Sequence, residues 1–134
     1  MKTAFKKTIG LLCGAALLAF LTGCASYNNN QNVADIVRHF QERGVKVDSV
    51  APMPAEILRA ESAVAIEVSG RQFGVYKFDI KVKKQKEKLD KIEENGSVYI
   101  MGVRFPALVN GSFMMMDYDQ NPEKEKIVAA FKSF

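Results

Sequence analysis

The residue types that most often carry catalysis or bind transition metals are scarce in this chain of 134 residues, which has one histidine and two cysteines. The histidine, His39, follows Arg38 within a helical pattern, which favours a surface position over a role as general base. No serine lies in a Gly-x-Ser-x-Gly nucleophile elbow, and no glycine-rich phosphate loop is present. The sequence therefore predicts no catalytic residues and no enzyme. A hydrolase whose site only the fold assembles is the least favoured alternative.

Long hydrophobic runs are absent as well. The longest, from Ile9 to Leu21, is shorter than the ~20 residues that an ordinary membrane-spanning helix needs. A positively charged segment with Lys2, Lys6 and Lys7 precedes this run, and small residues follow it. A basic start, a short apolar run and a small-residue end form the layout of an export signal. We therefore predict that residues 1–23 are a signal peptide that is cleaved.

The end of this segment differs from that of a plain secretory signal, which closes with an A-x-A-like site. Here the last residues are Leu21, Thr22, Gly23 and Cys24. They resemble the lipobox of bacterial lipoprotein precursors, and the resemblance covers residues 1–24 only. It implies cleavage before Cys24 and lipidation of that cysteine with a diacylglycerol and then an N-acyl chain.

The lipobox resemblance also implies where the protein resides, namely lipid-anchored on the exported side of a membrane. Residue 25 is alanine. In many Gram-negative lipoproteins an aspartate at that place signals retention in the inner membrane. The outer membrane is therefore favoured if the source has two membranes, and the outside of the cell membrane if it has one.

Processing would change the charge and thiol content of the chain. Three of the 19 basic residues lie in the signal, so 16 basic residues would face 15 acidic ones. A nearly neutral domain gives no electrostatic support for nucleic-acid binding, and we predict none. Cys13 would be removed and Cys24 lipidated, which leaves no disulfide, and we predict no cofactor beyond the lipid.

The chain after Cys24 divides into a tether and one domain. Residues 24–32 are predicted to be the lipidated cysteine and a polar tether, because Ala25 to Asn32 has no apolar period. Residues 33–134 are predicted to form a single small domain, with Asn32 capping a helix over 33–43 that ends at Gly44. The apolar residues of one helical face recur at Val33, Ile36, Val37 and Phe40.

Two hairpins are predicted after this helix. A turn at 69–70 would pair Ile66 with Phe73. A type I′ turn at Asn110-Gly111 would pair Leu108 with Phe113. Before them, the alternating residues 45–49 predict a short strand, the prolines of 51–54 its end, and 54–59 a brief helix.

A helix follows each hairpin in the pattern. Asp79 is predicted to cap a helix over 80–94, and Asn121 to cap the last helix with Pro122 in its first turn. The chain thus contains two strand–strand–helix units after the N-terminal helix. We predict an α+β fold, in which these units form one antiparallel sheet with the helices packed on one face.

Three clusters are candidates for binding, and each also has a structural explanation. Asp117, Asp119 and Asn121 match the opening of a calcium loop, but Pro122 and Val128 stand where that loop needs glycine and glutamate. Capping of the last helix explains the same residues better, so they are weak metal candidates. The run of lysines over 81–88 suits an anionic surface or, more simply, a solvated helix face. Met114-Met115-Met116 favours core packing, because adjacent strand residues point to opposite faces.

These patterns together predict a membrane-anchored bacterial envelope lipoprotein that acts as a non-enzymatic binding or structural module. The membrane would hold it through the lipid, and another envelope protein would be its partner. The alternative is a small-ligand or cation-binding envelope domain that uses the acidic 117–123 segment.

Overall fold

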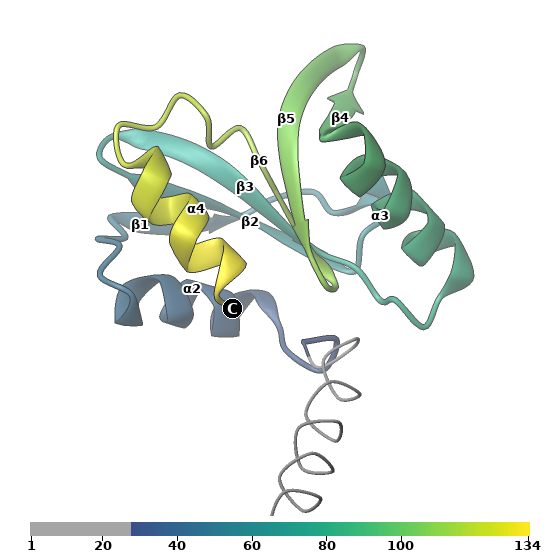
Figure 1. Cartoon of the computed structure of the whole chain (residues 1–134), viewed down its shortest axis with the longest axis horizontal. Helices are drawn as coiled ribbons and strands as arrows, with labels where there is room; N and C mark the ends of the chain where they lie inside the picture. Colours follow the sequence, from purple (N-terminus) through teal and green to yellow (C-terminus); the bar gives the residue numbers. More distant parts are fainter. Residues whose placement is uncertain (1–27) are drawn as a thin grey trace, which may run out of the picture.

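The computed structural model describes residues 28–134, which form an antiparallel sheet between helices (Figure 1). The helices are α2 (Val33–Glu42), the 3₁₀ turn η1 (Glu56–Leu58), α3 (Lys83–Asn95) and α4 (Lys124–Lys132). The strands are β1 (Ser49–Pro52), β2 (Ser62–Val68), β3 (Arg71–Lys77), β4 (Ser97–Ile100), β5 (Val103–Asn110) and β6 (Phe113–Met116). Their order in the sheet is β1-β2-β3-β6-β5-β4. The predicted α+β class and antiparallel sheet are confirmed.

Helix α2 begins and ends as predicted. The Asn32 side chain accepts the N–H of Asp35, and the Asp35 carboxylate accepts the N–H of Asn32, which closes a capping box. Ile36 and Phe40 are fully buried on the inner face of the helix. Gly44 follows with φ +83°, a left-handed conformation that glycine adopts without steric cost.

The first hairpin has the predicted register, with Ile66 opposite Phe73 and a two-residue turn at Ser69-Gly70. In the second hairpin the predicted turn is wrong. Asn110 pairs with Phe113, so the turn residues are Gly111 and Ser112, and only Gly111 has a positive φ. This is the pattern of a type II′ turn rather than type I′. The register changes by two residues, so every side chain keeps its predicted face.

The predicted strand over 45–49 is also wrong, because β1 begins at Ser49 and includes Pro52. Pro52 is tolerated because β1 is the edge strand beside β2. Val45 and Val47 instead pack against the core from the connection after α2, which explains their alternation. The helix predicted over 54–59 is reduced to η1.

Helix α3 begins at Lys83, three residues after its predicted start, and α4 begins at Lys124, three residues after its predicted cap. Residues 80–82 form a turn before α3 because Asp79 accepts the N–H of Lys81 at 3.0 Å. Asn121 does cap the chain before α4, since its Oδ1 accepts the N–H of Glu123 at 2.9 Å.

The two predicted strand–strand–helix units are present, with β3 and β6 as the paired central strands. Their helices do not lie on one face, however, so that part of the prediction is wrong. Helices α2 and α4 cover a face whose core includes Ile66, Val75 and Met115. Helix α3 and η1 cover the opposite face, whose core includes Tyr76 and Met114.

The backbone of Asp117 explains why α3 and α4 lie on opposite faces. After β3 the chain remains extended, so Phe78 points to the same face as Tyr76 and joins the core under α3. After β6 Asp117 has φ +59°, and this left-handed residue breaks the alternation. Tyr118 therefore joins the core under α4, although Met116 faces the other side.

Candidate functional site

The segment before α2 is bound to the body of the domain through Asn28, which is only 1% exposed. Its Nδ2 donates to the carbonyl of Asn110 at 3.0 Å, and its Oδ1 accepts the N–H of Ser112 at 2.9 Å. The Ser112 hydroxyl also donates to the carbonyl of Asn28 at 3.2 Å. The side chain lies so close to Gly111 that any Cβ there would collide with the carboxamide. The turn between β5 and β6 thus forms a socket for Asn28.

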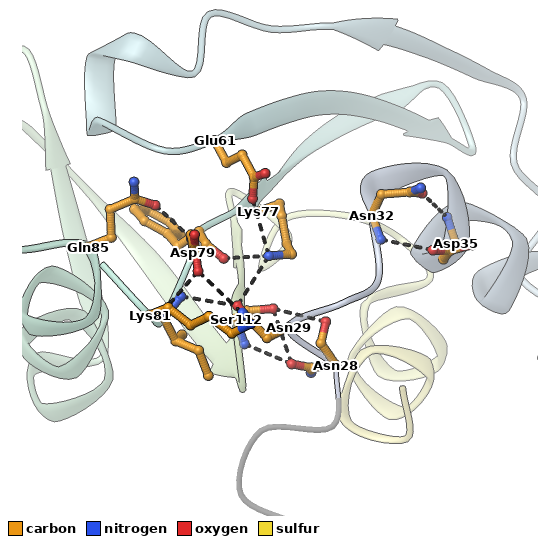
Figure 2. A network of polar contacts seen from close by, with 12 residues as sticks. Asn28, Asn29, Asn32, Asp35, Glu61, Lys77, Asp79, Lys81, Gln85 and Ser112 are labelled. Carbon is orange, nitrogen blue, oxygen red and sulfur yellow. Dashed lines mark hydrogen bonds and ion pairs between the residues drawn. The ribbon is translucent and has the colours of Figure 1, made fainter. Parts of the chain in front are cut away.

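Asn29 continues this attachment on the neighbouring loop (Figure 2). Its Nδ2 donates to Asp79 at 3.3 Å, and its Oδ1 accepts the N–H of Ile80 at 3.1 Å. Residues 28–32 therefore belong to the fold, and the prediction that they are part of a tether is wrong. Only Cys24 to residue 27 of the predicted tether lie outside the described residues.

Lys77 is the buried charge of this region, with 3% of the residue exposed. It is the last residue of β3, and its ammonium donates to the carbonyl of Phe78 at 2.6 Å. Glu61 and Asn29 each place an oxygen 3.4 Å from the same nitrogen (Figure 2). The ring centroid of Phe113 lies 5.7 Å from it. A buried ammonium needs such partners because its desolvation is costly. Lys77 therefore connects the N-terminal segment to both hairpins.

Asp79 lies at the exposed edge of this network. The N–H of Lys81, and secondly the amide of Asn29, lower the pKa of the Asp79 carboxyl by donating hydrogen bonds to its charged form. The N–H of Asp79 itself donates to Gln85 at 2.6 Å, which holds the start of α3 against the same loop. We call the set Asn28, Asn29, Lys77, Asp79 and Ser112 the docking cluster.

Cys24 and the other lipobox residues, Leu21, Thr22 and Gly23, lie outside the described residues. The predicted signal peptide over 1–23 lies outside them too. Among residues 28–134, none of the helices is both long and apolar enough to cross a membrane. The lipid anchor therefore stays a prediction.

The weak metal candidates Asp117, Asp119 and Asn121 do not combine into a ligand set. The Asn121 side chain is buried and donates to the carbonyls of Val68 and Arg71 while it accepts from Glu123. Burial raises the pKa of the Asp117 carboxyl, as does the nearby Asp119, against the opposing effect of Arg71. Within residues 28–134 no three His, Cys, Asp or Glu side chains are grouped as a metal site would require.

The methionine run and the histidine have structural surroundings. Met115 is buried under α4, whereas Met114 and Met116 are buried on the opposite face, so the three thioethers cannot converge on one ion. The His39 Nε2 lies 3.0 Å from the Ala130 carbonyl and 2.9 Å from the Ser133 hydroxyl. It thus joins α2 to the last turn of α4.

The lysines near the start of α3 separate into two sides of the helix. Lys86 pairs with Asp90 at 3.0 Å on one side. Lys84, Lys88 and Lys91 line a hollow on the other side, together with Arg59 after η1. The helical spacing of the lysines already predicts that they spread over more than one face, but nothing in the sequence places Arg59 beside α3.

Comparisons with protein-family models, with curated proteins and with solved structures found no match. The docking cluster was missed by sequence analysis. One signal was present, since Lys77 interrupts an otherwise apolar run from Phe73 to Phe78 and a lysine at that place needs a partner. The partner residues Asn28 and Asn29 are distant in sequence, and polar asparagines are equally typical of a tether.

Proposed function

We propose that the protein is a lipid-anchored envelope lipoprotein and a non-enzymatic binding module, held close to the bilayer in one orientation. The lipobox resemblance of residues 21–24 supports the anchor, and the docking of Asn28 carries the fixed orientation. Only residues 25–27 separate Asn28 from Cys24, and four extended residue steps reach about 14 Å at most. A domain on so short a connection cannot turn freely, because its attachment point is fixed in the fold.

The docking cluster then marks the end of the domain that faces the membrane. This end includes the turn at Gly111-Ser112 and the loop from Asp79 to Lys81 (Figure 2). Helix α3 leads away from it, and about 18 Å of helical rise separates Lys83 from Asn95. The β4–β5 hairpin follows at the far end of α3 (Figure 1).

The far hairpin provides a surface for a protein partner in the envelope. Three large apolar side chains are exposed there, Tyr99 by 65%, Met101 by 91% and Val103 by 55%. Tyr99 lies opposite Arg104 and Val103 lies opposite Ile100, so the two side chains are on different faces of the hairpin, and the partner would contact the exposed tip from both sides. The orientation set by the docking cluster would present this tip away from the lipid, where a partner can reach it.

The anchor is tested by Cys24→Ser in the native host, with membrane fractionation and mass spectrometry of the N-terminus. We expect the wild type to begin at a cysteine that carries acyl chains and to sediment with membranes. We expect the variant to remain unprocessed. A wild type without lipid would overturn the proposal.

The orientation has its own test, in lipid vesicles that carry a headgroup quencher. Lys81→Cys and Met101→Cys variants are labelled with a fluorophore on the introduced thiol, since lipidation occupies Cys24. We expect strong quenching at position 81 and little at position 101. Equal quenching at both positions would contradict a fixed orientation.

The cation-binding alternative for segment 117–123 is less favoured, because Asn121 already uses its carboxamide on backbone partners.

A further inference from the structure

A hollow of about 500 Å³ lies between α3 and the residue that follows η1. Its lining residues are Arg59, Lys84, Gln85, Glu87, Lys88 and Lys91. Lys84, Lys88 and Lys91 are spaced i, i+4 and i+7, which places them along one side of the helix. Arg59 faces this side from a separate element, so the hollow is bounded by cations from two parts of the chain.

The charges of this hollow are unbalanced. Four cationic side chains line it against one carboxylate, that of Glu87. Among residues 28–134 the ion pairs are Arg38–Asp35, Lys77–Glu61 and Lys86–Asp90, and none involves a cation of the hollow. Like charges brought together without partners repel one another, and an anion in the hollow would remove this repulsion.

Lys88, one of the lining residues, shows the effect of this crowding. Lys88 is half-buried, unlike the exposed Lys84 and Lys86 on the same helix. Burial of its ammonium, and secondly the charge of Arg59, lower the pKa of Lys88 from its ordinary value. Both effects disfavour the charged form of Lys88, and a bound anion would counteract both.

We propose that this hollow binds a phosphate-bearing anion that carries at least two negative charges. The net excess of three positive charges favours a multiply charged ligand, and a guanidinium with three ammonium groups suits phosphate oxygens. The Gln85 Oε1 accepts from Asp79, which leaves its amide N–H groups to donate into the hollow. The Glu87 carboxylate can accept a hydrogen bond from a hydroxyl group of the same ligand. The volume lies within the ~300–1,000 Å³ typical of small-molecule sites.

The proposal does not depend on the lipid anchor, because the ligand could be a soluble phosphate compound or the headgroup of a lipid. Its test uses the protein purified in a non-ionic detergent and titrated by calorimetry at constant ionic strength. The probes are sodium pyrophosphate, glycerol 3-phosphate and dihexanoyl phosphatidic acid. Sodium sulfate at the same ionic strength serves as the control for non-specific screening.

We expect saturable binding of at least one phosphate probe, and about tenfold weaker binding by Lys88→Gln and by Arg59→Gln, since each removes a charge-assisted hydrogen bond. The matched control is Lys86→Gln, which removes the same charge from the other side of α3. We expect it to change the affinity by less than about twofold, because exposed charges outside the site are screened.

The outcomes separate the two sources of the ligand. Preference for pyrophosphate or glycerol 3-phosphate supports a soluble ligand, and preference for dihexanoyl phosphatidic acid supports a lipid headgroup. Absence of saturable binding to all three probes would overturn the proposal. Equal losses in Lys88→Gln and Lys86→Gln, or binding no stronger than that of sulfate, would overturn it too.

Discussion

The cores on the two faces of the sheet differ in side-chain composition. The face under α2 and α4 is closed by a dense aromatic core, to which Phe40, Phe73, Phe113, Phe131 and Phe134 contribute. Edge-to-face ring pairs such as Phe40–Phe73, with centroids 5.7 Å apart, add specific contacts there. The face under α3 has fewer aromatic side chains, Tyr76 and Phe78, beside aliphatic residues, alanines and methionines, and its single long helix is rich in lysine. We therefore expect the face under α2 and α4 to contribute more of the stability, while the other face offers charged surface.

The difference begins at equivalent positions of the two strand–strand–helix units. Tyr76-Lys-Phe-Asp79 precedes α3, and Met116-Asp-Tyr-Asp119 precedes α4. Lys77 in the first unit keeps the strand extended and joins the docking cluster. Asp117 in the second unit turns the chain to the other face. The two units have the same order of elements, but their helices cover opposite faces of the sheet, because Lys77 has an extended backbone and Asp117 a left-handed one.

Truncation of one core residue under each helix gives the largest expected effect. We expect Phe131→Ala to lower the free energy of unfolding by about 3–5 kcal/mol, because it leaves a cavity among rigid aromatic rings. We expect Leu89→Ala to cost about 2 kcal/mol, at the low end for leucine, because methionines beneath α3 can fill part of the space. Denaturant unfolding of both variants measures the difference. A larger loss for Leu89→Ala would contradict the assignment of stability to the face under α4.

The docking of Asn28 can be isolated with two glycine substitutions. We expect Gly111→Ala to destabilise the fold by about 1–3 kcal/mol more than Gly70→Ala, because the new methyl group expels Asn28 and leaves the N–H of Ser112 unpaired. Gly70 is the matched control, since it has φ +76° in the other hairpin turn and open space where a Cβ would lie. Both glycines have positive φ but lie in different turn types, so cleavage before α2, rather than stability alone, reports the loss of Asn28 docking.

The measurement for the glycine pair is thermal unfolding together with limited proteolysis of the segment before α2. Cleavage near residues 28–32 should increase in Gly111→Ala alone. Equal stability and equal cleavage in the two variants would show that the docking of Asn28 contributes nothing beyond the turn.

Sequence patterns predicted most of the local structure, because hairpins and helices depend on neighbouring residues. The register of the first hairpin followed from Ser69-Gly70 between alternating apolar residues. The faces of the helices did not follow, because no sequence signal marks Asp117 as a left-handed residue that breaks the alternation. The hollow and the docking cluster were unpredictable for a similar reason, since Arg59 and Asn28 meet their partners only through the tertiary fold. The turn at Gly111-Ser112 was misplaced because Asn-Gly is also the usual sequence of a type I′ turn.

The smallest expected effect concerns the pH dependence of stability at two aspartates, one from each unit. The pKa of Asp117 is raised in the folded protein, first by burial, so its stabilising contribution is present below the unfolded value of 3.8 and is lost as the pH rises through the folded pKa. We therefore expect Asp117→Asn to be more stable than the wild type at pH 7, by roughly a few tenths of a kcal/mol after solvent screening, and to lose this advantage at pH 3. Asparagine retains the left-handed backbone, so the fold should not change.

Asp79 should behave in the opposite way, because its pKa is lowered, first by the hydrogen bond from Lys81. Its contribution is present above the unfolded value of 3.8 and is lost as the pH falls through the folded pKa. Asp79→Asn should thus be less stable than the wild type at pH 7 and should approach it at pH 3. Urea unfolding of the wild type and both variants at pH 7 and pH 3 measures how the stability difference between each variant and the wild type changes with pH. If this difference changes in the same direction for both variants, the two aspartates before α3 and α4 do not differ in their electrostatics.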